Sequence, residues 1–298
     1  MRITQLKVEN LGKLKDFEAN IGEKGNFIAL VQKYSDEIPF EPTNEALIFR
    51  YLFDCWDCDE FLDEAVSLET RMECICKLET EKSFSVCITQ EKETAATLEA
   101  VPTESARNLH SSWRSIIYPF EYSRNAVYEP NCRGVLNGIH TVVERYKMEY
   151  QNLLEPYNAR TVRSQAEEVL TAIDLFIKES PAIKVNDSIE LRLDENGCFV
   201  NSTGECNDGH LSEKERYYID FYRFLLNLRL QKHMREMLGE ETTYPIVLLD
   251  VFSYIEKEKW GFFFEELRRL GMQVFVLLYN GNEELEKYFD AIFPLSRK

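Results

Sequence analysis

Acidic side chains form the densest group in the chain that could bind a divalent metal. Six of them follow one predicted helix: Asp54, Asp57, Asp59, Glu60, Asp63 and Glu64. With Asp250, which ends an apolar run, they could support a metal-dependent nuclease, because carboxylates hold the metal ion that activates water. A solvated helix face, or a docking patch for a basic partner, is the simpler interpretation of these charges. The nuclease alternative predicts Mg²⁺- or Mn²⁺-dependent cleavage that is lost in Asp250→Ala.

Cysteine and histidine residues make a weaker case for a metal site. Cys55 and Cys58 have the C-x₂-C spacing of half a zinc site, but the other pair has the poorer C-x-C spacing. That second pair, Cys74 and Cys76, falls on one face of a predicted strand. Four histidines are far apart and match no paired metal or base–nucleophile motif: His110, His140, His210 and His233. We therefore predict no bound metal and expect the eight cysteines to be reduced thiols.

The net charge of −17 limits the partners that the protein can bind by itself. Binding of DNA or RNA needs clustered Lys and Arg, because counterion release supplies most of the non-specific affinity, and the sequence contains no such cluster. The acidic balance also argues against an anionic membrane face, and no apolar run approaches the roughly 18 residues that span a bilayer. We expect a cytosolic globular protein that binds neither nucleic acid nor membranes alone.

The N-terminal part of the sequence predicts several strands and one helix. Residues 1–31 alternate as three short strands, and residues 70–79 and 83–90 form a hairpin. A helix is expected to begin near Thr43 or Asn44, since both residue types cap helices well. These elements belong to a predicted N-terminal lobe at 1–104.

The middle of the chain, 105–180, is predicted to be helical. Seven residues recur with alternating steps of three and four: Leu136, Ile139, Val143, Tyr146, Tyr150, Leu153 and Tyr157. After a turn, similar spacing continues in Val162, Ala166, Val169, Ile173 and Phe176. This heptad pattern predicts a short antiparallel helical hairpin, although two ordinary amphipathic helices on a globular body explain it nearly as well.

Strands and helices alternate again in the C-terminal part, 181–298. The expected elements are strands at 188–193 and 198–200, a long helix from Ser212, a buried strand at 244–250, a helix through Leu267 and a strand at 272–278. Such alternation favours a largely parallel sheet with helices on its faces. Ser212 and Glu215 form an S-x-x-E capping box, a structural reason for both residues at the start of the long helix.

Four segments follow one another in the C-terminal part: Leu211-Ser212-Glu213-Lys214-Glu215, Ile246-Val247-Leu248-Leu249-Asp250, Val251-Phe252-Ser253-Tyr254-Ile255-Glu256 and Met272-Gln273-Val274-Phe275-Val276. In this order they resemble the LSxGE-like signature, the strand ending LLLDD or LLLDE, the FSxLD segment and the GxQVFxTT-like strand of ABC-type ATPase heads of the RecF, SMC and Rad50 kind. The opening strand is also similar, and the helical hairpin stands where this family inserts its coiled coil. The resemblance implies an α/β head with a mixed or parallel sheet, flanking helices and a short hairpin insertion.

The phosphate-binding loop of that family has no intact counterpart in this chain. GxxxxGK[ST] uses glycines for backbone approach, lysine for phosphates and a hydroxyl for Mg²⁺. Here Glu41-Pro42-Thr43-Asn44 stands where GKTN is expected, so a cation and a backbone donor are lost. Thr43 alone remains as a metal ligand, and helix capping explains it more simply.

The remaining catalytic positions also depart from the family pattern. Asp250 matches the metal-binding aspartate, but Val251 follows it where the family places its catalytic carboxylate, so no base orients water. Lys214 replaces the signature glycine, while Ser212 persists. The resemblance leaves Thr43, Ser212, Lys214 and Asp250 as a degenerate nucleotide site with no catalytic residue.

These departures predict a pseudo-ATPase rather than an enzyme. The resemblance implies a structural or regulatory subunit of a bacterial DNA-repair, DNA-maintenance or defence assembly. Its expected partner is a protein, either an active ATPase subunit or a second copy of the chain. We expect no cofactor of its own, with ATP and Mg²⁺ bound only in trans at a dimer interface. An interaction scaffold with no nucleotide role stays open beside the nuclease alternative.

Overall fold

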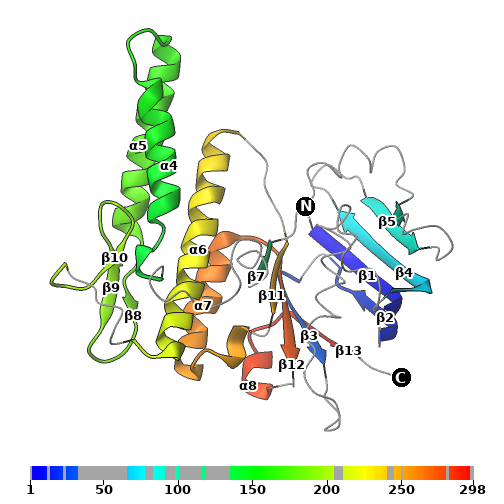
Figure 1. Cartoon of the computed structure of the whole chain (residues 1–298). Coiled ribbons are helices and arrows are strands. Elements are labelled where there is room, and N and C mark those ends of the chain that lie inside the picture. Colours follow the sequence, from blue (N-terminus) through cyan, green and yellow to red (C-terminus); the bar gives the residue numbers. More distant parts are fainter. Residues whose placement is uncertain are drawn as a thin grey trace. The chain divides into compact units, whose positions relative to one another are not determined.

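The structure is a computed structural model, drawn in Figure 1. It describes residues 2–11, 14–22, 25–32, 66–77, 83–90, 98–100, 116–118, 135–204, 211–239, 245–249, 251–279 and 282–295. The chain forms two compact units, each built from separate stretches of sequence. The first contains Met1–Val127, Thr243–Ser253 and Gly271–Lys298, and the second contains Tyr128–Thr242 and Tyr254–Leu270.

An antiparallel sheet in the first unit has the strand order β2-β1-β4-β5-β6. Its strands are β1 Arg2–Leu11, β2 Leu14–Asn20, β4 Val66–Lys77, β5 Ser83–Gln90 and β6 Leu98–Ala100. Alternate residues Phe17 and Ala19 of β2 are buried while Glu18 is exposed, as expected for a sheet with one covered face. The predicted N-terminal strands and the hairpin formed by β4 and β5 are confirmed.

The second sheet of this unit is parallel throughout, in the order β13-β3-β12-β11-β7. Its strands are β3 Phe27–Gln32, β7 Ile116–Tyr118, β11 Ile246–Leu249, β12 Val274–Tyr279 and β13 Ala291–Leu295. Continuous apolar runs in β3, β11 and β12 are buried, which is typical of parallel sheets covered on both faces. The predicted parallel sheet is therefore confirmed.

Strand β7 shows that the prediction of helix throughout 105–180 is wrong at Ile116–Tyr118. Three residues are too few to display the two-residue period of a strand. The strand is defined instead by its parallel pairing with β11, which is distant in sequence. Tertiary pairing of this kind leaves no local signal.

A buried glutamine joins the two sheets within the first unit. The Gln273 side chain accepts from the Ile3 N–H at 2.8 Å and donates to the Ile3 carbonyl at 2.8 Å and the Gly25 carbonyl at 3.3 Å. The contact connects β1 to the segment that enters β12. All polar atoms of this buried amide have partners, which removes the cost of burying it.

The second unit contains the predicted helical hairpin, whose two helices lie side by side in Figure 1. Helix α4 spans His140–Leu153 and α5 spans Arg160–Glu179, and a Lys147–Asp174 ion pair of 2.8 Å bridges them. Four residues predicted to face the seam are buried in α5: Ala166, Val169, Ile173 and Phe176. Tyr157 is wrongly predicted there, because it lies in the turn and is 83% exposed.

A small antiparallel sheet and two long helices complete this unit. The sheet order is β10-β9-β8, with β8 Ile183–Lys184, β9 Glu190–Leu193 and β10 Phe199–Val200. The helices are α6 Glu213–Met237 and α7 Lys257–Leu270. Their aromatic rings interlock, with the Phe263 ring 5.0 Å from Tyr218 and 4.8 Å from Phe221. Within the part of the chain that the structure describes, no helix is both long and apolar enough to span a bilayer.

Candidate functional site

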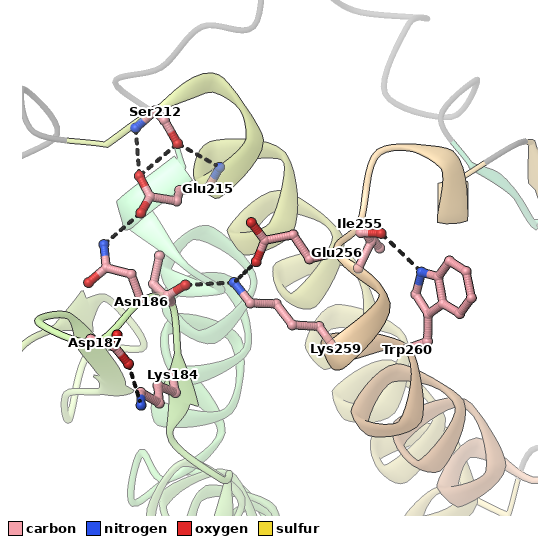
Figure 2. Close-up of polar contacts among 10 residues, drawn as sticks. Lys184, Asn186, Asp187, Ser212, Glu215, Ile255, Glu256, Lys259 and Trp260 are labelled. Atoms are coloured by element: carbon pink, nitrogen blue, oxygen red, sulfur yellow. Dashed lines mark hydrogen bonds and ion pairs between the residues drawn. The ribbon is translucent and has the colours of Figure 1, made fainter.

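A groove of about 650 Å³ opens beside the first turn of α6 in the second unit. Three segments line it, and Figure 2 draws the polar contacts among several of their residues. The β8–β9 connection supplies Asn186, the start of α6 supplies Ser212 and Lys214, and the segment that leads into α7 supplies Tyr254 and Glu256. Two of the four residues predicted for nucleotide binding therefore line one groove.

Ser212 caps α6 through the predicted capping box, which the structure confirms. Its backbone N–H and its hydroxyl each donate to Glu215 Oε2 at 2.7 Å, and the Glu215 N–H donates to Ser212 Oγ at 3.3 Å. Both polar hydrogens of Ser212 are thus committed to one carboxylate. The box satisfies N–H groups that lack partners at a helix start.

Asn186 connects this cap to the small sheet. Its side-chain amide donates to Glu215 Oε1 at 2.6 Å, so both carboxylate oxygens of Glu215 accept hydrogen bonds. The Asn186 bond, followed by the bonds from Ser212 and the charge of Lys259, lowers the pKa of Glu215 against the opposing effect of burial. Glu215 is therefore held as an ionised carboxylate.

Lys259 of α7 also lines the groove. Its Nζ donates to the Val185 carbonyl at 2.6 Å, lies 3.5 Å from Glu256 Oε2 and sits 4.0 Å from the centre of the Tyr218 ring. The cation is thus shared among a carbonyl, a carboxylate and an aromatic face. Burial, and then the Glu256 charge, raise the pKa of Tyr218, so its phenol stays neutral.

Tyr254 forms an aromatic part of the groove lining. It is 53% exposed, although its ring packs 5.0 Å from that of Tyr217. The segment behind it is fixed, because the Trp260 indole donates to the Ile255 carbonyl at 3.0 Å. A large exposed aromatic on a fixed backbone is the type of residue that anchors protein interfaces.

The donors of this groove do not fit a nucleotide phosphate. Four carboxylates outnumber the three lysines of the lining: Asp187, Glu215, Glu256 and Glu258 against Lys184, Lys214 and Lys259. A phosphate that used the Ser212 donors would have to displace Glu215, which holds the cap together. The arrangement suits contact with a protein surface, which can supply donors and acceptors in matching positions.

Only part of the predicted site can be placed. Ser212 and Lys214 lie at the groove, whereas Thr43 and Asp250 lie outside the described residues. Val251, next to Asp250 in sequence, is completely buried. It begins the short 3₁₀ helix Val251–Ser253, and Asp250 separates this helix from β11 in the sequence.

Most of the candidate metal ligands also lie outside the described residues. The acidic stretch at 54–64, with Cys55 and Cys58, lies outside the described residues. Cys74 and Cys76 fall in β4, as predicted for strand residues. Across the ranges given above, no three His, Cys, Asp or Glu side chains are grouped closely enough to hold a metal ion.

Sequence reasoning missed three residues of the groove: Asn186, Lys259 and Tyr254. Asn186 gives a turn signal, because asparagine bonds nearby backbone N–H groups, but its bond to Glu215 joins distant segments. Tyr254 lies in the segment that resembles FSxLD and Lys259 lies in the predicted helix through Leu267, but neither pattern assigns these residues to a groove. Their role depends on packing against α6.

Comparison with known proteins supports the fold. No family model and no curated protein matches the chain. Among solved structures, it is similar to an Smc head bound to the C-winged helix domain of ScpA, with TM-score 0.55, 10% identity and coverage of 99% of this chain and 94% of that one. The chain is also similar to the recombination mediator protein RecF of the RecFOR pathway, with a TM-score of 0.53, 11% identity and coverage of 99% of this chain and 96% of that one. A Pyrococcus furiosus Smc head with an extended coiled coil, bound to the C-terminal domain of ScpA, is similar with a TM-score of 0.51, 10% identity and coverage of 100% of this chain and 94% of that one.

These similarities confirm the predicted ABC-ATPase-head-like α/β fold. They extend over nearly the whole chain, including the helical hairpin, and agree with the parallel sheet of the first unit. Similarity at sequence identities near 10% shows the fold alone, because one fold can host many different activities.

Proposed function

We propose that this chain is an ABC-type ATPase head that does not hydrolyse nucleotide and serves as a structural or regulatory subunit. The observation that carries the proposal is the buried Val251, which follows Asp250 and lies two positions after Leu249, the last residue of β11. Hydrolysis in this fold needs a carboxylate there to orient water, and a buried isopropyl group can neither accept a proton nor reach solvent.

The groove at the start of α6 is the proposed contact with a partner head. Its exposed components, Lys214 and Tyr254, point to binding rather than turnover. The partner would be an active ATPase subunit or a second copy of this chain. A protein partner is supported by the Smc heads of similar fold, which are bound to domains of ScpA.

ATP and Mg²⁺ would enter only in trans, held by the partner. The groove's engaged Ser212 donors and excess of carboxylates support this restriction. We infer a bacterial DNA-repair, DNA-maintenance or defence assembly as the setting, since RecF of similar fold acts in the RecFOR pathway. The net charge of −17 supports recruitment through protein rather than direct DNA binding.

The test is ATP turnover by the purified chain with Mg²⁺, run beside binding of a fluorescent ATP analogue. We expect neither turnover nor binding. Hydrolysis that disappears in Asp250→Ala would refute the proposal, because it would show an intact metal site. Adding DNA to the assay separates a head that needs activation from one that has no activity.

A further inference from the structure

We propose that the small sheet β10-β9-β8 is a rigid link between the α4–α5 hairpin and the cap of α6, with Asn186 as the positioning residue at the cap. The inference rests on the proposed function only where it treats the cap as a docking surface. The link itself is defined by contacts inside the second unit and needs no partner.

At the cap end, Asn186 holds its own turn and the capping box together. Its Oδ1 accepts from the Ser188 and Ile189 N–H groups at 2.8 Å each, while its Nδ2 donates to Glu215 Oε1 at 2.6 Å. One side chain therefore fixes the entry to β9 and the carboxylate that binds Ser212. A displacement of the turn at Asn186 would therefore displace Glu215 and disturb the capping box.

Strand β9 carries this constraint across the unit. It is the central strand, paired with β8 through Leu191 and with β10 through Leu193. Leu191 is fully buried, so packing and hydrogen bonds both restrain the strand. Its four residues span about 13 Å at the usual rise of a strand.

At the hairpin end, residues at the start of α4 and within it donate hydrogen bonds to the β9–β10 turn. Three consecutive carbonyl oxygens accept hydrogen bonds: Glu195 from Lys147 Nζ at 3.1 Å, Asn196 from His140 Nδ1 at 3.0 Å, and Gly197 from the Ile139 N–H at 2.9 Å. Because a carbonyl oxygen only accepts, His140 Nδ1 is the donor of this bond. These contacts tie the turn to both the first and the second turn of α4.

The β9–β10 turn also packs closely against the start of α4, in addition to its hydrogen bonds. A side chain at Gly138 would collide with the Gly197 carbonyl oxygen. Gly197 has φ +80°, and a Cβ there would lie 3.1 Å from Val143 Cγ2 and 3.2 Å from Ile139 Cγ1. A side chain at either glycine would push the turn away from α4, and β9 would pass this displacement to Asn186.

Hydrogen exchange in Gly197→Ala tests the link at a distance. The amides of Ser212 and Glu215 report the box, and we expect them to exchange about fivefold faster, which corresponds to losing one helix cap. Gly204→Ala is the matched control, because Gly204 has nearly the same φ, +78°, and no atom of the described residues lies within 4 Å of the position of a Cβ. The control should leave both amides unchanged.

A second pair of variants separates the link from general loosening of the hairpin. Lys147→Met removes the bond to the turn and the 2.8 Å ion pair with Asp174, whereas Asp174→Asn removes only the ion pair. Lys147→Met should accelerate exchange at Ser212 and Glu215, and Asp174→Asn should not.

Three results would overturn the link. Gly197→Ala could leave the Ser212 and Glu215 amides unchanged, Gly204→Ala could match its effect, or Asn186→Ala could fail to accelerate the same amides. None of these outcomes bears on ATP turnover. A normal link with measurable hydrolysis would instead refute the proposed function alone.

Discussion

Replacing Glu215 by alanine should destabilise the start of α6 by about 2 kcal/mol. The carboxylate completes the capping box with Ser212, and losing such a cap costs about 1 kcal/mol. It also accepts the 2.6 Å bond from Asn186, whose part-buried amide would lose that partner at a further cost of about 1 kcal/mol. Because the two contacts use different oxygens of Glu215, the two losses of free energy should add.

Urea unfolding followed by circular dichroism measures this change as a lower midpoint with an unchanged slope. Glu213→Ala is the matched control, since Glu213 also lies in the first turn of α6 but is exposed and outside the box. Loss of its favourable interaction with the helix dipole should cost about 0.5 kcal/mol or less. Equal midpoints for the two variants would refute the assignment of Glu215 as the connecting residue.

Four further predictions follow from the contacts described above. The pKa of Glu215 lies below its ordinary value of 4.5, so the box stabilises the fold above that pH and is lost as pH falls through the lowered pKa; acid unfolding of Glu215→Gln should accordingly be less steep than that of the wild type. Gln273→Ala should cost about 3 kcal/mol in urea unfolding, because it leaves buried backbone groups of the first unit unpaired. Phe263→Ala should lower the free energy of unfolding by about 4 kcal/mol because Phe263 is fully buried, and Phe262→Ala should lower it clearly less because Phe262 is partly exposed. Equal urea midpoints for the two variants would contradict the packing of α7 on α6. Tyr254→Ala should leave the unfolding midpoint within about 0.5 kcal/mol of the wild type and weaken association with an active head or with a second copy, measured by sedimentation; unchanged association would remove Tyr254 from the docking surface.

Elements with a strong local period could be predicted from the sequence. The spacing of Ala166, Val169, Ile173 and Phe176 identifies the buried face of α5, and the S-x-x-E pattern at Ser212 identifies the start of α6. In both cases the residues that carry the signal are neighbours in the folded chain. Local chemistry is then enough to define the element.

Contacts between distant segments could not be predicted in the same way. Strand β7 exists through its pairing with β11, and Asn186 acts through Glu215, which lies 29 positions further along the chain. The pattern around Lys259 predicts a helix, but its position over the Tyr218 ring depends on how α7 packs against α6. These features are set by tertiary packing, which a single sequence does not record.

The persistence of Ser212 and Glu215 does not by itself argue for nucleotide binding. Each completes the other's hydrogen bonds in the capping box, so any helix beginning here would benefit from both, whether or not a phosphate ever approached. Lys214 differs, because it is exposed on the groove and takes no part in the box. A charge-reversing Lys214→Glu should therefore leave the unfolding midpoint almost unchanged, as expected for a surface residue. If it also leaves association with a partner head unchanged, the start of α6 is a well-capped helix and the docking surface must lie elsewhere.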